Sequence, residues 1–151
     1  MDGLIERLRE IHKDRLAGIV LDHQPVYRLR VRLTGNAPVA AQRHALGGSV
    51  LPVVFETGAR ATVAALRASL TKNQTALGEI FPTLAGLSID ERTSEIVIEV
   101  YAPTPAAEEV AHGALPQALA RLAVPARIEI APVYPTALAD VFGGAKLAPN
   151  P

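Results

Sequence analysis

A chain of 151 residues, with 49% hydrophobic and 20% charged residues, has the length and composition of an ordinary globular protein that can bury a core. Fifteen basic and fifteen acidic residues give a formal net charge of zero, which argues against nucleic acid as a partner because phosphate binding needs an excess of Lys and Arg. The absence of cysteine excludes disulfides, thiolate nucleophiles and zinc sites of the cysteine type. No stretch approaches the roughly 20 apolar residues of a membrane span, so no membrane partner is expected.

The first third of the chain predicts a helix followed by a β-hairpin. Residues 4–11 carry apolar side chains at helical spacing, and the runs 16–22 and 27–33 predict two strands joined by a turn. The second run alternates strictly, so four of its residues are expected to face the core: Tyr27, Leu29, Val31 and Leu33. Its three arginines are expected to face water: Arg28, Arg30 and Arg32.

This hairpin pattern occurs a second time. The run 84–90, Leu-Ala-Gly-Leu-Ser-Ile-Asp, repeats the run 16–22, Leu-Ala-Gly-Ile-Val-Leu-Asp, almost residue for residue. A second alternating run follows it, with Ile96, Ile98 and Val100 on one face. The repetition predicts a duplicated structural unit.

Between and after the hairpins the pattern predicts two strands and two helices. Residues 50–55 and 127–130 read as strands, and residues 61–80 as a helix rich in Ala and Leu. Residues 103–122 predict another helix that opens with Thr104 as its cap and Pro105 at its first position. Gly113 and Pro116 are expected to break that helix into two pieces.

These elements predict an α+β fold built from two duplicated antiparallel β-hairpin units, with helices packed on one face of each small sheet. The expected organisation is an N-terminal helix over 1–14, a first hairpin-strand-helix unit over 15–82 and a second hairpin-helix-strand unit over 83–133. Residues 134–151 are rich in Pro and Gly, so they are expected to form an extended tail or linker.

No catalytic, metal or cofactor site is predicted. The four histidines, His12, His23, His44 and His112, have no second ligand at a metal spacing. A serine nucleophile would need a turn of the Gly-x-Ser-x-Gly type, and a phosphate loop would need glycines that open a helix; neither pattern is present.

Two sets of charged residues allow a functional and a structural interpretation. Asp22 and Asp90 end the repeated runs and could pair as carboxylates of a glycosidase, but aspartate at a strand end commonly caps the following turn, which is the favoured interpretation. The arginines at 28, 30 and 32 could bind an acidic partner. The favoured interpretation is the solvated face of a half-buried strand, paired with a glutamate on a neighbour.

The repeated motif resembles the pro-regions of bacterial chymotrypsin-like serine proteases of the alpha-lytic protease and streptogrisin type. The resemblance rests on the run 16–22 with 27–33, and more closely on the run 84–98, and it extends over most of residues 15–133. Asp140-Val141-Phe142-Gly143-Gly144 is also similar to the junction at which mature proteases of this family begin.

The resemblance implies a noncatalytic folding assistant and inhibitor of a cognate serine protease domain, downstream in the same precursor, that is secreted or periplasmic. It implies that a tail segment occupies the protease cleft, and the candidate residues are Thr136, Ala137, Leu138, Ala139, Asp140 and Val141. Two alternatives remain open. A stand-alone protein-interaction or ligand-binding module would have an apolar pocket between helices and a sheet, and an enzyme would have a cleft with two titratable groups in contact.

Overall fold

The computed structural model describes residues 1–131. The chain divides into two compact units: Met1–Ser69 with Ile89–Glu95 form the first, and Leu70–Ser88 with the described residues from Ile96 onward belong to the second. Each unit contains helical segments and a small sheet, so the predicted α+β class is confirmed. None of the helices within residues 1–131 combines the length and apolar character needed to cross a membrane.

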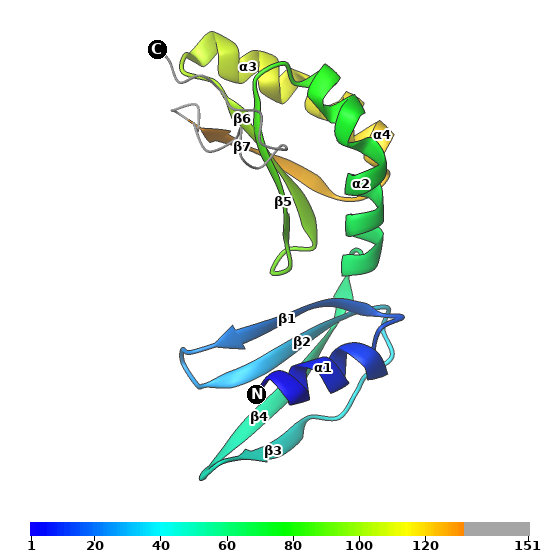
Figure 1. Ribbon diagram of the computed structural model, residues 1–151, viewed down its shortest axis with the longest axis vertical. Helices are drawn as coiled ribbons and strands as arrows, with labels where there is room; N and C mark the ends of the chain where they lie inside the picture. Colours follow the sequence, from blue (N-terminus) through cyan, green and yellow to red (C-terminus); the bar gives the residue numbers. More distant parts are fainter. Residues whose placement is uncertain (132–151) are drawn as a thin grey trace. The chain divides into compact units, whose positions relative to one another are not determined.

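The first unit contains a four-stranded sheet in the order β1-β2-β4-β3 (Figure 1). Its elements are α1 (Asp2–Ile11), β1 (Leu16–Asp22), β2 (Arg28–Thr34), β3 (Gln42–Leu46) and β4 (Ser49–Ala59). β1 and β2 form the predicted antiparallel hairpin, and β4 lies parallel to β2 on its other side. Leu4 and Leu8 of α1 are buried in one core with Leu29, Val31 and Leu33 of β2, which explains the spacing of apolar residues in both elements.

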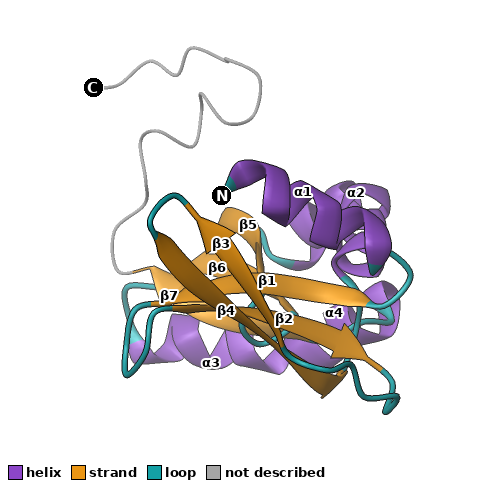
Figure 2. Ribbon diagram, turned by 90° about the horizontal axis from the view of Figure 1, so that it is seen from below, coloured by secondary structure: helices purple, strands orange, loops and turns teal. Residues whose placement is uncertain are grey.

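The second unit contains a three-stranded sheet in the order β5-β6-β7. Its elements are most of α2 (Val63–Ile80), most of β5 (Leu84–Asp90), most of β6 (Glu95–Tyr101), and all of α3 (Pro105–Gly113), α4 (Leu115–Leu122) and β7 (Ala126–Ala131). β7 lies parallel to β6. α3 and α4 lie along one side of this sheet (Figure 2). Ile96, Ile98 and Val100 are buried, so β6 presents its predicted apolar face to the core.

The break in the second helical region is confirmed. α3 begins after Thr104, whose hydroxyl accepts a hydrogen bond from the Ala107 N–H at 3.1 Å, and Pro105 occupies the first turn. α3 ends at Gly113, and α4 begins at Leu115 with Pro116 in its first turn, where the missing N–H of proline costs no helical hydrogen bond.

Four details differ from the sequence prediction. Both sheets are mixed and not purely antiparallel, because the third strand of each repeat runs parallel to the second. β3 was not predicted, since its residues do not alternate between apolar and polar. Tyr27 lies before β2 and is 49% exposed, so it does not belong to the core. The side chains of Arg30 and Arg32 are only 18% and 11% exposed, so they do not simply face water.

The duplication extends beyond the hairpins. Each repeat has a helix, a hairpin and a third strand parallel to the second strand of the hairpin: α1-β1-β2-β4 and α2-β5-β6-β7. A parallel third strand requires a crossover connection, and the two repeats fill that connection differently. The first uses β3 and its turn, and the second uses α3 and α4.

Candidate functional site

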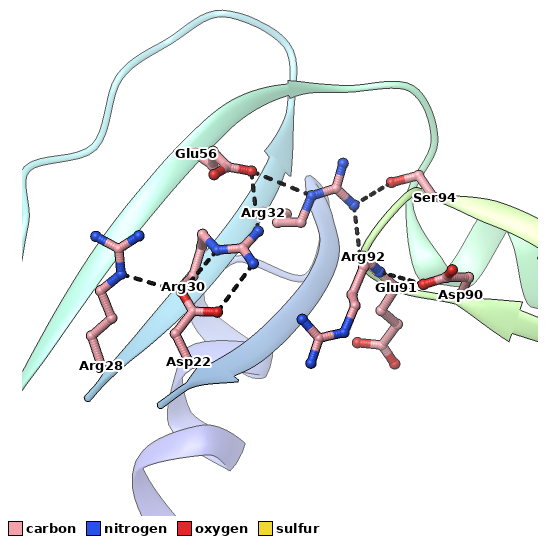
Figure 3. Close-up of polar contacts among 9 residues, drawn as sticks. All are labelled: Asp22, Arg28, Arg30, Arg32, Glu56, Asp90, Glu91, Arg92 and Ser94. Atoms are coloured by element: carbon pink, nitrogen blue, oxygen red, sulfur yellow. Dashed lines mark hydrogen bonds and ion pairs between the residues drawn. The ribbon is translucent and has the colours of Figure 1, made fainter. Parts of the chain in front are cut away.

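The polar face of the first sheet gathers most of the described charge contacts (Figure 3). Leu29, Val31 and Leu33 of β2 are buried on the core face. Side chains alternate along a strand, so the arginines between them lie on the opposite face. They form an arginine row: Arg28, Arg30 and Arg32.

Asp22 is the main anion that binds the arginine row. Its carboxylate accepts hydrogen bonds from Arg30 at 3.1 and 3.2 Å and from Arg28 at 3.2 Å. These bonds, led by that from Arg30, hold the pKa of Asp22 below its ordinary value, against the opposing effect of burial. Glu56 of β4 adds a second anion, 3.4 Å from Arg30 and 3.5 Å from Arg32, as expected for a glutamate on the neighbouring strand.

Arg32 binds the turn of the second hairpin, residues 89–95, which belongs to the first unit and is called here the hairpin tip. Its guanidinium donates to the Glu91 carbonyl oxygen and to the Ser94 hydroxyl, both at 2.7 Å (Figure 3). Ser94 is fully buried and has a φ of 61°, a backbone conformation that residues other than glycine rarely adopt. The tip is therefore fixed by a charged donor at a strained, buried position.

Residues of strand β1 also contact the hairpin tip. Gly18 is the cross-strand partner of Arg32, and a Cβ at position 18 would lie 2.7 Å from the Glu91 Cβ and 2.8 Å from its carbonyl oxygen. The adjacent Ile19 N–H donates to the Glu91 carboxylate at 3.2 Å. The glycine of the repeated motif is thus required here because another segment of backbone lies directly over it.

The two repeated aspartates have different roles. Asp90 accepts a hydrogen bond from the Arg92 N–H at 2.9 Å, so the predicted turn-capping role is confirmed for Asp90. Asp22 instead binds Arg28 and Arg30, and the turn interpretation is wrong for Asp22. Neither carboxylate contacts the other in these interactions, and the structure does not bring them together as a pair.

Both sheets contain an equivalent row of three residues that lie on three neighbouring strands. The first row consists of Gly18, Arg32 and Glu56, which are neighbours across β1, β2 and β4. The second row consists of Gly86, Glu99 and Glu129 on β5, β6 and β7. The two rows are equivalent because the strands pair in the same register. Arg32 and Glu56 follow the paired residues Leu29 and Val53, and Glu99 and Glu129 follow the paired residues Ile96 and Ala126 at the same spacing.

The second row differs from the first in charge and in what lies over its glycine. Glu99 takes the place of Arg32, and its Oε1 would lie 2.9 Å from a Cβ at position 86. Glu129 is paired with Arg127 of the same strand at 2.8 Å. In the second repeat, a flexible carboxylate therefore fills the space that backbone fills over Gly18.

The second unit also has an apolar groove of about 300 Å³. Its lining includes residues from the connection between α2 and β5, the end of β6, the connection that follows it, and α3: Phe81, Thr83, Tyr101, Pro103, Ala107 and Val110. Val110 is 74% exposed, which is unusual for a large aliphatic side chain. The volume is at the lower end for a small-molecule site.

His12 and His44 each interact with a neighbouring side chain. The ring centroids of His12 and Phe55 are 5.1 Å apart, and burial, with a smaller effect of Arg15, lowers the pKa of His12. His44 lies 2.8 Å from the side-chain oxygen of Gln42. Across residues 1–131, no cluster of three or more His, Cys, Asp or Glu side chains is arranged to hold a metal ion.

The predicted cleft-binding segment, Thr136 to Val141, lies outside the described residues. Sequence reasoning did not identify Glu91 and Ser94 as partners of Arg32. The glycine shared by both repeated runs, Gly18 and Gly86, could have indicated that another segment packs closely against the strand, but a glycine does not identify that segment. No protein-family model and no curated protein matches the chain.

Proposed function

We propose that this chain is the noncatalytic pro-region of a secreted or periplasmic trypsin/chymotrypsin-like serine protease, and that it acts as a folding assistant and inhibitor of that protease. The observation that carries the proposal is the position of β7. Among residues 1–131 it is an edge strand of the three-stranded sheet, and the chain continues from its last residue, Ala131, into the segment that contains the candidate cleft-binding residues 136–141.

An edge strand has one side of its backbone available for another strand, and such pairing supplies main-chain hydrogen bonds. A tail that follows an edge strand directly is covalently linked to that surface, so binding of the sheet edge raises the effective concentration of the tail at the protease cleft. The small and aliphatic residues of the segment, including Ala137, Leu138 and Val141, suit a narrow cleft.

The test is inhibition of the cognate protease in trans. The intact chain is expected to inhibit, and deletion of residues 136–151 is expected to weaken inhibition without abolishing binding, since the sheet edge keeps its own contacts. Leu138→Asp or Val141→Asp should weaken inhibition in the same direction, because each places a carboxylate in an apolar cleft. Ala145→Asp, beyond the inserting residues, is the matched control.

Equal inhibition constants for the intact and truncated chains would remove the tail from the mechanism. Absence of both inhibition and binding by the intact chain would contradict the proposal as a whole. Folding assistance is measured separately, as the rate at which denatured protease regains activity with and without the chain.

The apolar groove favours a second candidate function, a stand-alone protein-interaction or ligand-binding module. In this case an apolar fluorescent probe should bind the chain, and Ala107→Trp, which would fill the groove, should abolish binding. Val50→Trp, at an exposed position of β4 in the first unit, is the control. Probe binding that survives Ala107→Trp would contradict this alternative.

A further inference from the structure

The first row and the second row differ in net charge. In the first row Arg32 lies beside Glu56, so a cation and an anion are neighbours on adjacent strands. In the second row Glu99 lies beside Glu129 in the same register. Like charges directly opposite one another on neighbouring strands destabilise a sheet.

The ion pairs formed among residues 1–131 neutralise the second row only in part. Arg127 pairs with Glu129 at 2.8 Å, at a site where the Glu129 side chain is 51% exposed. Among residues 1–131, no Lys, Arg or His forms an ion pair with Glu99. Glu99 alternates with the buried Ile98 and Val100, so it lies on the face of the sheet opposite the core.

The first row binds a turn of another segment, the hairpin tip. The backbone of Glu91 packs over Gly18, and Arg32 binds the Glu91 carbonyl oxygen and the Ser94 hydroxyl. The glycine therefore admits a turn of another segment, and the charged residue beside it fixes that turn. At Gly86 the same space contains the Glu99 carboxylate, the end of a flexible side chain that can rotate away.

We propose that the second row is a docking site for a basic turn of the partner protease, with an Arg or Lys of that turn between Glu99 and Glu129. The inference rests on the proposed function and extends it to a second contact besides the edge of β7. Charge complementarity selects the occupant, since two adjacent carboxylates favour a cation and a guanidinium can contact both. The contact is specific in position because the glycine is the one place on β5 where backbone can approach so closely.

The experiment compares binding of the full chain to the cognate protease whose nucleophilic serine has been replaced by alanine, so that cleavage does not interfere. The variants are Glu99→Gln, Glu129→Gln and the double variant. The control is Glu79→Gln/Glu109→Gln, which removes the same charge from exposed positions on α2 and α3. We expect the double variant to bind about tenfold more weakly and with a smaller salt dependence, and the control to bind within about twofold of the unaltered chain.

The outcomes separate the two proposals. Unaltered affinity and salt dependence in the double variant would overturn the docking site and leave the proposed function in place. No binding by the unaltered chain would overturn both. If the double variant does not fold, the exposed Glu129→Gln decides the question alone, and a dissociation constant equal to that of the unaltered chain would overturn the docking site.

Discussion

Gly18 and Glu91 are in backbone contact across the first unit: a Cβ at position 18 would lie 2.8 Å from the Glu91 carbonyl oxygen. At its counterpart in the second repeat, Gly86, the atom nearest to an added Cβ is the Glu99 Oε1, at 2.9 Å. The same motif position is therefore restricted by rigid backbone in one repeat and by a movable carboxylate in the other.

This difference predicts unequal effects of the same substitution. Gly18→Ala should lower the free energy of unfolding by about 2 kcal/mol, because the backbone of Glu91 must shift to admit the methyl group. Gly86→Ala should change the free energy of unfolding by less than about 1 kcal/mol, since Glu99 can rotate and alanine favours an ordered strand over glycine. Urea titration of both variants gives the comparison. Equal losses at the two positions would contradict the assignment of Glu91 as the obstacle.

Arg32→Ala should remove the donor to the buried Ser94 hydroxyl and to the Glu91 carbonyl oxygen, at a cost of about 2 kcal/mol in the free energy of unfolding. Arg43→Ala, at an exposed position of β3, should have little effect. In a Ser94→Ala background the loss from Arg32→Ala should be smaller, because one of the two acceptors is gone. Additive losses in this double-mutant cycle would show that the two side chains are not coupled.

The lowered pKa of Asp22 predicts how the stability depends on pH. The folded chain binds the Asp22 proton more weakly than the unfolded chain, so the stabilisation by Asp22 is complete above an unfolded pKa of about 4 and is lost as the pH falls through the folded pKa. The stability difference between the unaltered chain and Asp22→Asn should be constant from neutral pH to about pH 5 and shrink below about pH 4. Chemical unfolding at several pH values measures it.

Asp14→Asn is the matched control for this pH series. Asp14 is exposed, and within the described part of the chain no ion pair includes it. Asp14→Asn removes a carboxylate without removing an arginine contact, so it measures the effect of losing an aspartate alone. If the stability differences for Asp22→Asn and Asp14→Asn depend on pH in the same way, the arginine contacts are not the cause of the pH dependence.

Gly78→Ala should raise the stability. Gly78 lies on an exposed face of α2, and a Cβ there would meet no atom within 4 Å. Alanine is favoured over glycine inside a helix by about 1 kcal/mol. Thermal unfolding followed by circular dichroism should show a higher midpoint, and an unchanged or lower midpoint would indicate that the helix needs the freedom of glycine at this position.

The local patterns predicted most of the elements. Strict alternation in the run 28–33 identified β2 and its buried residues, with Leu29 and Val31 among the least exposed in the chain. β3 could not be predicted, because Gln42–Leu46 lies at the edge of its sheet with residues that are half-buried or exposed, and no hydrophobic face marks it. Edge strands bury too little surface to require an apolar pattern.

The sequence by itself determined the two hairpins, the N-terminal cap of α3 and the apolar faces of β2 and β6, because each depends on residues within a few positions of one another. It also determined the duplication, because the run 84–90 repeats the run 16–22. Only the tertiary structure decided that β4 and β7 run parallel to β2 and β6, and that the glycine-aspartate motif holds a hairpin tip in one repeat and a carboxylate in the other. These contacts join residues far apart in the chain, such as Ile19 and Glu91. The alternation of side chains along a strand predicts which face of the strand is buried, but it does not predict which segment covers the other face.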